Sequence, residues 1–398
     1  MLSASQSLRP LPLKVAAVSA ALVLATAACG GQVNASGGAP VSGGDKIGQC
    51  PDTIDATKHE LSSPVGLGPR GEKPAAPETV DLTEEEAAKA KAANLKVGIA
   101  MQTEDIDYSK ILIRSMTATF EKYGVKVLQV TDGQWTVTKQ QSDIQNLIQL
   151  KPDGIVSVPT DSVAMASTYK TVQQNGIKLV MLDDTPKGME WPKDVSATSG
   201  MDQKGMGTIA MSILAECIPQ GGTVGMVKMD FVLWAANQRE DGAREWLQKN
   251  RPDIKLKEVG VTNPNDVAQR AGDFITANPD VQGLWTPWDG PGLQALTSLR
   301  GQGSTIPVTT QDLGTQFGLN IASGSQLIGG GAQLLDVQGA MHAQTLIKAM
   351  LGEKLPQYVA QPAIAVTKSN LTDAWTRVWG SAPPADIADA CKKTPGCA

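Results

Sequence analysis

The sequence is poor in the residues that most hydrolytic and metal chemistry requires. Its 398 residues include two histidines and five cysteines, so a histidine-based catalytic site and a histidine-rich metal centre are not expected. We predict no catalytic residues, no metal and no cofactor. The 35 Lys and Arg residues do not outnumber the 40 Asp and Glu residues, and the net charge of −5 argues against a nucleic-acid-binding surface. The length fits two domains.

Nucleotide-binding and esterase motifs are also missing. No GxGxxG or GxxxxGK[ST] pattern follows the first predicted strand, and the sequence has no GxSxG nucleophile elbow. His59 lies in a region without predicted structure, and His342 lies in the middle of a predicted helix. Nothing in the sequence therefore nominates an enzyme.

The N-terminus has the pattern of an export signal. Arg9 and Lys14 precede the apolar run 15–24, which is too short to span a membrane, and small residues lead to Cys29. The position of Cys29 resembles a bacterial lipobox, although Thr26 replaces the usual aliphatic residue; a plain secretory signal is the alternative. We expect a signal peptide over 1–28 and a lipid-anchored flexible tether with a short helix over 29–94. The protein would then lie on the outer face of the cytoplasmic membrane.

Four cysteines remain when Cys29 carries a lipid. An oxidising compartment favours one or two disulfides among Cys50, Cys217, Cys391 and Cys397, but the sequence does not choose among the three full pairings. Cys391 and Cys397 would close a small loop in the C-terminal tail. Cys50 would instead attach the N-terminal segment to the body of the protein.

From residue 95 onward, apolar strands alternate with amphipathic helices. Strands are predicted at 95–101, 125–130, 154–158, 177–182, 222–227, 254–259, 281–285, 306–309 and 327–328. Helices are predicted at 109–123, 137–150, 161–174, 203–217, 235–249, 265–277, 290–300 and 335–351, besides one that Thr83 opens by a capping box. This order predicts an α/β protein with two doubly wound parallel sheets, whose ligand binds beyond the carboxyl ends of the strands.

Polar and indole side chains follow these strand ends. Eight of the sixteen aromatic residues are tryptophans. Several lie at or just after predicted strands, namely Trp135, Trp234, Trp285 and Trp288, and Trp191 lies in the loop after the fourth strand. Asp and Gln side chains bind hydroxyl groups, while Trp offers a flat apolar face. A single Asp at such a position would be explained as a helix N-cap, and a single Trp as a residue of the core. Together they favour a small polyhydroxylated ligand.

Five segments in order resemble the ribose-type family of periplasmic sugar-binding proteins, the type I solute receptors of ABC importers. They are Pro159-Thr-Asp-Ser162, Val180-Met-Leu-Asp183, Arg239-Glu-Asp-Gly242, Asn278-Pro-Asp-Val281 and Gln333-Leu-Leu-Asp336. The resemblance covers about residues 95–380. Lactose-repressor-like regulators share the fold but carry an N-terminal helix-turn-helix, whereas this chain carries an export signal.

The resemblance implies two lobes joined by a three-strand hinge. The N-terminal lobe would comprise 95–199 and 334–362, the C-terminal lobe 200–333 and 363–380, and the tail 381–398. Tyr108 would cover the sugar ring, Asp183 would bind hydroxyls, and Arg239 would contact ring and hydroxyl oxygens; Asp312 and Gln333 correspond to the acid of the second lobe and the hinge amide. The full set predicted to contact the ligand is Tyr108, Asp107, Trp135, Asp183, Asp184, Trp234, Asn237, Arg239, Trp288, Asp289, Asp312 and Gln333.

Departures from the family pattern bear on the ligand. Asp183-Asp184 stands where ribose-like relatives have Asp-Arg, and Trp288-Asp289 stands where they have Asn-Asp. A polyol, another sugar or a ligand with a cationic group would suit this more acidic pocket. The adjacent carboxylates would raise one pKa or bind a metal only if they faced each other, and neighbours at a strand end usually point apart.

These observations predict a monomeric, exported receptor that binds a sugar or polyol between two lobes and delivers it to an ABC permease by hinge closure. No nucleic-acid partner is expected, and the lipid anchor would be its membrane attachment. A receptor that signals to a membrane protein is one alternative. A cell-envelope enzyme acting on carbohydrate through paired Asp residues is the other.

Overall fold

The computed structural model describes residues 50–231 and 233–398. The predicted signal peptide, Cys29 and most of the tether lie outside these residues. Within them, no helix combines the length and apolar character required to cross a membrane.

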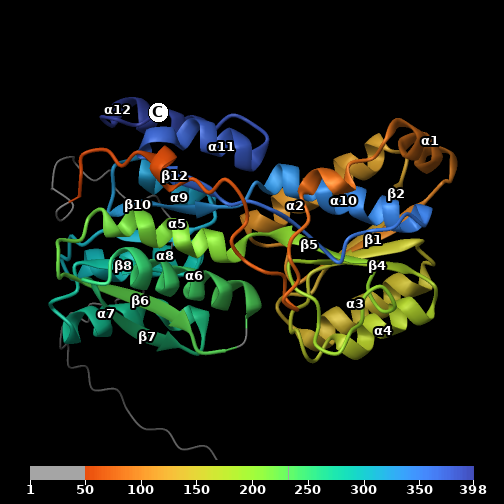
Figure 1. The fold of residues 1–398 in the computed structure, drawn as a ribbon, viewed down its shortest axis with the longest axis horizontal. Coiled ribbons are helices and arrows are strands. Elements are labelled where there is room, and N and C mark those ends of the chain that lie inside the picture. The colour runs from red at the N-terminus through yellow and green to blue at the C-terminus, as the bar shows by residue number, and fades with distance from the viewer. Residues whose placement is uncertain (1–49, 232) are drawn as a thin grey trace, which may run out of the picture. The chain divides into compact units, whose positions relative to one another are not determined.

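Two six-stranded sheets form the framework (Figure 1). Sheet A has the strand order β11-β5-β4-β3-β1-β2 and is parallel throughout. Its strands are β1 (Lys96–Met101), β2 (Lys126–Asp132), β3 (Gly154–Ser157), β4 (Lys178–Leu182), β5 (Ala197–Met201) and β11 (Tyr358–Gln361). Helices of the same part of the chain lie on both faces, as the alternation of strand and helix predicts.

Sheet B repeats this topology with the order β12-β10-β9-β8-β6-β7. Its strands are β6 (Thr223–Met229), β7 (Lys255–Val261), β8 (Gly283–Trp285), β9 (Val308–Gln311), β10 (Leu327–Ala332) and β12 (Ile364–Thr367). The strand β12 is antiparallel to β10, with Ile364 paired to Ala332. Because β12 begins where β10 ends, at the passage between the two sheets, the chain enters sheet B in the opposite direction.

Twelve α-helices complete the described part of the chain. They are α1 (Glu84–Ala92), α2 (Asp107–Lys122), α3 (Val137–Gln149), α4 (Ala166–Gln174), α5 (Gln203–Ala215), α6 (Trp234–Asn250), α7 (Val267–Ala277), α8 (Asp289–Gly301), α9 (Thr315–Ala322), α10 (Leu335–Leu351), α11 (Leu371–Trp379) and α12 (Ala385–Lys393). The apolar side of α2 is buried, with Leu112, Met116 and Phe120 fully covered, because apolar residues recur at helical spacing. The predicted capping box is present at Thr83.

The chain passes three times between the two sheets. It leaves sheet A after β5 to begin α5, leaves sheet B after β10 to begin α10, and leaves sheet A again after β11 to begin β12. The helix α10 contacts α2, β3, β4 and β5, as expected for a helix that packs back onto the first lobe. The sequence prediction missed β5, β11, β12, α9, α11 and α12, most of which are short.

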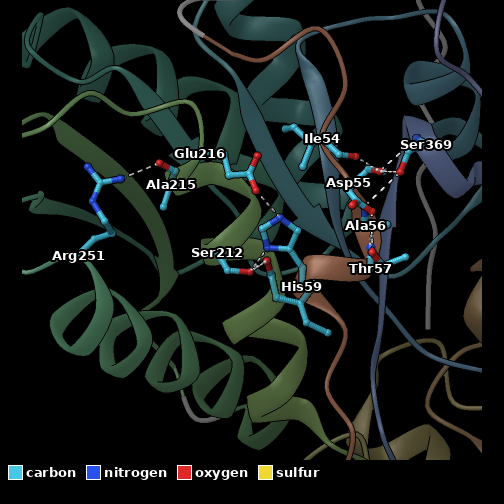
Figure 2. Close-up of polar contacts among 12 residues, drawn as sticks. Ile54, Asp55, Ala56, Thr57, His59, Ser212, Ala215, Glu216, Arg251 and Ser369 are labelled. Atoms are coloured by element: carbon cyan, nitrogen blue, oxygen red, sulfur yellow. Dashed lines mark hydrogen bonds and ion pairs between the residues drawn. The ribbon is translucent and has the colours of Figure 1, made fainter.

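Residues 50–82, which we call the N-terminal strap, pack on elements of both sheets. A disulfide joins Cys50 to Cys217, His59 contacts Ser212 of α5 (Figure 2), and Ala75 forms a parallel bridge with β11. The expectation of a flexible tether over 29–94 is therefore wrong for the strap. Its Pro- and Gly-rich sequence hides this packing, because few of its contacts are local.

Both histidines are structural in the strap and hinge region. His59 is buried, with Nδ1 2.8 Å from Ser212 Oγ and Nε2 2.9 Å from Glu216 Oε1 (Figure 2); burial lowers its pKa although Glu216 opposes the shift. His342 is buried 2.6 Å from Ser199 Oγ, and burial lowers its pKa to about 3. A second disulfide, Cys391–Cys397, closes the tail loop.

Candidate functional site

Two aspartates occupy equivalent positions in the two sheets. Asp183 follows β4 and Asp312 follows β9, and these strands hold the same place in the two strand orders. Both residues have left-handed backbone conformations, with φ of 57° and 69°. Their backbone N–H groups donate to Ser199 O and Gly331 O, each at 2.9 Å. Positive φ in a residue other than glycine is uncommon and collects at functional sites.

The Asp183 carboxylate accepts hydrogen bonds from two helices, one packed on each sheet. Tyr108 Oη, from the first turn of α2, donates to Asp183 Oδ2 at 2.8 Å. Gln203 Nε2, at the first residue of α5, donates to Asp183 Oδ1 at 3.3 Å. Burial raises the pKa of Asp183, while the Tyr108 hydrogen bond and the charge of Arg239 lower it. Burial beside this carboxylate also raises the pKa of Tyr108 well above its ordinary value.

Arg239 connects this pair to the acid of sheet B. Its Nε donates to Gln203 Oε1 at 2.8 Å, and its Nη1 donates to Asp312 Oδ2 at 3.0 Å and to Pro287 O at 2.9 Å. Asp312 Oδ1 also accepts from Gln333 Nε2 at 2.7 Å. A continuous polar chain thus runs from Tyr108 through Gln203 to Gln333. The guanidinium is buried and ion-paired, which fixes its orientation.

Gln203 is the residue that the sequence analysis missed. It joins the two charged groups Asp183 and Arg239, and it is 2% exposed. Its amide follows directly on the first passage between the sheets. A polar side chain just after the end of β5 would have suggested Gln203 as a site residue. The sequence analysis searched only the ends of predicted strands, and β5 was not among them.

Two further acids approach the site from opposite sides. Asp107 Oδ2 accepts hydrogen bonds from the N–H and Oγ1 of Thr315, both at 2.9 Å, and so links α2 to the start of α9. Asp289 starts α8, and its Oδ1 accepts from Gly290 N at 2.8 Å. Burial, with the charges of Asp312 and Asp107, raises the pKa of Asp289 to about 7.

Asp184 faces different groups from Asp183, although the two are adjacent. Its carboxylate accepts a hydrogen bond from Ser162, and the Arg70 guanidinium of the strap acts on its charge. Burial raises the pKa of Asp184 to about 6. The described ranges 50–231 and 233–398 contain no group of three His, Cys, Asp or Glu side chains arranged to hold a metal.

Comparison with known proteins places this arrangement in a family. Residues 97–354 match the family described as periplasmic binding protein domain. The chain belongs to this family. Curated relatives of this periplasmic binding protein include the ribose import binding protein of Bacillus subtilis, which is 24% identical over 67% of this chain and 85% of its own length. The xylitol-binding protein of Mycolicibacterium smegmatis is 26% identical over 59% of this chain and 67% of its own length.

Solved structures support the fold of the periplasmic binding protein. A solute-binding protein of an ABC transporter from Mycobacterium smegmatis, with bound glycerol, has a TM-score of 0.63 and 24% identity, and covers 70% of this chain and 96% of its own. One from Agrobacterium vitis, with bound allitol, has a TM-score of 0.62 and 20% identity, and covers 70% and 97%. The predicted family and two-lobed α/β architecture are thereby confirmed.

The tryptophans of this periplasmic binding protein differ in exposure. Trp135 is 54% exposed, and Trp234 and Trp288 are half-buried at the starts of α6 and α8. Trp285 is fully buried in β8 and packs in the core, so its interpretation as a ligand-facing residue is wrong. A side chain inside a strand at the sheet centre is surrounded by helices rather than by the site.

The Asn237 side chain makes a local hydrogen bond at the start of α6. Its Oδ1 accepts a hydrogen bond from Leu233 N at 3.2 Å, which covers the first turn of α6. A ligand-contacting role for Asn237, Trp135, Trp234 or Trp288 stays a prediction.

Proposed function

We propose that this protein is an extracytoplasmic receptor that binds a small sugar or polyol and delivers it to an ABC permease. The observation that carries the proposal is the buried polar chain from Asp183 through Gln203 and Arg239 to Asp312, which joins elements of sheet A to elements of sheet B. Buried ionisable groups that converge from two lobes and have perturbed pKa values are typical of a recognition site, and this supports the proposal. Relatives named for ribose and xylitol support the same class of ligand.

Binding would replace side-chain contacts by ligand contacts. Hydroxyl groups would donate to Asp183 and Asp312 and accept from Arg239, while Tyr108 would contact the ligand from α2. The Gln203–Asp183 hydrogen bond, at 3.3 Å, is the link of the polar chain that joins the two lobes, so we propose that the ligand enters there. Micromolar affinity requires only about −8 kcal/mol, which a few such hydrogen bonds supply.

The mechanism that follows is hinge closure. A ligand held by both lobes favours the conformation in which both sets of groups reach it, and thereby shifts the equilibrium between open and closed states. A permease that recognises the closed state would take the ligand up. We propose that Cys29 carries the lipid that keeps the receptor at the membrane surface.

A thermal-shift screen of the purified protein against pentoses, hexoses and polyols tests the binding function. A ligand stabilises the folded state by mass action, so a bound compound raises the melting temperature as its concentration increases. Asp183→Asn, Arg239→Lys and Asp312→Asn should each reduce the affinity for that compound at least tenfold. Asp241→Asn, an exposed acid of α6, is the matched control and should retain it.

Two results would contradict the proposal. One is the absence of any shift across the screen for protein that is folded by circular dichroism. The other is full affinity in all three site variants, which would move the binding site elsewhere.

A further inference from the structure

Carboxylates outnumber cations at the candidate site. Asp183, Asp312, Asp289 and Asp107 all act on one another or on Arg239 through their charges. Among the ion pairs of the described residues, only Asp312 of these four has a cation within 4.0 Å, namely Arg239. One guanidinium therefore faces four acids, and the site carries an excess of negative charge.

Asp289 and Asp107 converge on the same point from α8 and α2. A Cβ placed on Gly314 would lie 2.3 Å from Asp289 Oδ2 and 3.3 Å from Asp107 Oδ2. A side chain at position 314 would therefore displace the Asp289 carboxylate from its present position. Asp107 is satisfied by two donors from Thr315, whereas the hydrogen bonds of the described residues give Asp289 a donor at Oδ1 and none at Oδ2.

Gln333 supplies a second, independent sign of a missing donor. The residue is 2% exposed, and its Nε2 donates to Asp312 Oδ1 at 2.7 Å. Because a carboxylate only accepts, this contact fixes the orientation of the amide and leaves Oε1 as the free atom. That oxygen is buried and has no hydrogen-bond partner in the described part of the chain. A buried acceptor without a donor is unfavourable, so a ligand donor is expected there.

The two oxygen atoms without a hydrogen-bond donor have the same chemistry. Asp289 Oδ2 and Gln333 Oε1 are both acceptors, and the charge around them is negative. A hydroxyl group would donate one hydrogen bond and leave the charge unbalanced. A protonated amine donates up to three hydrogen bonds and carries the balancing positive charge.

We propose that the ligand is an amino-substituted sugar or polyol, whose ammonium group binds Asp289 while its hydroxyl groups bind the polar chain. This inference rests on the proposed function and narrows its substrate class. Bringing an ammonium group to Asp289 would also favour the ionised carboxylate, whose pKa is raised to about 7 without it. The groups that face Asp289 are Asp312, Asp107, Arg239 and the N–H of Gly290.

Isothermal titration calorimetry with matched pairs tests the inference. The pairs are sorbitol with glucamine, galactose with galactosamine, and glucose with glucosamine, each amine also being tested as its N-acetyl derivative. At pH 7, at least one amine should bind ten or more times more tightly than both its neutral counterpart and its N-acetyl form. Asp289→Asn should lower that preference at least tenfold, and the control Asp241→Asn should keep it.

The outcomes separate the two proposals. If neutral members bind as well as or better than the amines, or if only a sugar outside the pairs binds, the amine inference fails and the receptor function stands. If no compound of the pairs or of the wider screen binds, the receptor function fails as well. The N-acetyl comparison needs no variant, so it decides the matter even if Asp289→Asn does not fold.

Discussion

At the scale of single residues, Arg239 holds the polar site together. It is 5% exposed and contacts Gln203, Asp312 and the carbonyl of Pro287. A buried charge is stable only with such partners, so removal of one partner is more costly than the pair itself is stabilising. We therefore expect changes at Arg239 to affect both stability and ligand binding.

We predict that Arg239→Ala lowers the free energy of unfolding by about 3 kcal/mol, because Asp312 loses its counter-charge. Urea denaturation followed by circular dichroism measures this change. Arg377→Ala is the control, since Arg377 is partly exposed and its ion pairs are longer, at 3.6 and 3.8 Å; it should cost less than about 1 kcal/mol. Equal losses of unfolding free energy in the two variants would show that the buried Arg239–Asp312 ion pair is no more important for stability than an exposed one.

Asp289 makes stability depend on pH. Its pKa is raised from 3.8 to about 7 by burial and by neighbouring acids. Below about pH 4 the Asp289 carboxyl is protonated in both the folded and the unfolded state and does not lower the free energy of unfolding. Between pH 4 and 7 the unfolded state releases the proton while the folded state keeps it, so the free energy of unfolding falls as the pH rises, and the full cost of the buried carboxylate is present above pH 7.

We therefore predict that Asp289→Asn raises the stability of the ligand-free protein at pH 8, by about 4 kcal/mol, and has little effect at pH 4. Thermal melts of both proteins from pH 4 to pH 8 measure the difference. A difference that is constant across this range would contradict the raised pKa. Asp241→Asn should show no comparable pH dependence.

At the scale of elements, the N-terminal strap is attached most firmly at α5. The Cys50–Cys217 disulfide joins residues 167 positions apart, whereas Cys391–Cys397 joins residues 6 apart. The hydrogen bonds of Val65 and Gly66 N–H to Asp202, just before α5, add a second attachment. The strap lies outside residues 97–354, which match the family.

We predict that the double variant Cys50→Ser/Cys217→Ser loses more stability than Cys391→Ser/Cys397→Ser. Closing a longer loop removes more entropy from the unfolded chain, and the simple estimates are about 5 and about 2 kcal/mol. Urea denaturation of the two double variants gives the comparison. A larger loss in the tail variant would mean that the strap contributes little to folding.

The helices and strands show which elements can be predicted from local sequence patterns. The apolar side of α2 and the Thr83 cap were predicted because each depends on residues within a few positions. The start of α4 at Ala166 lies later than the predicted 161, since Asp161 instead accepts from the N–H groups of Val163 and Ala164 in a turn. The short strands β5, β11 and β12 lack a local signal of their own.

At the scale of the whole molecule, two sheets of matching topology bring Asp183 and Asp312 to corresponding strand ends. Sequence predicted both acids and Arg239, but not the glutamine between them. Trp285, which the sequence analysis grouped with the tryptophans at strand ends, is buried in the core. Side-chain type and strand order determine which residues can lie at the candidate site. Packing determines which of them are accessible to a ligand.

The proposed lipid anchor gives the last prediction. Cys29→Ser should move the protein from the membrane fraction to the soluble fraction of the cells that produce it, because a lipid chain provides the attachment. Fractionation followed by immunoblotting measures this, with Cys391→Ser as the control. Retention of Cys29→Ser in the membrane fraction would contradict the lipoprotein proposal.

The sequence by itself determined the alternation of strands and helices, the repeated α/β architecture, the family and most of the charged residues of the site, because these depend on composition and on short spacings. The tertiary structure alone decided the two disulfide pairings, the packing of the strap, the separation of Asp184 from Asp183 and the position of Gln203 between Asp183 and Arg239. Each of these joins residues through the path of the folded chain or the direction of a side chain, and neither is encoded in local pattern.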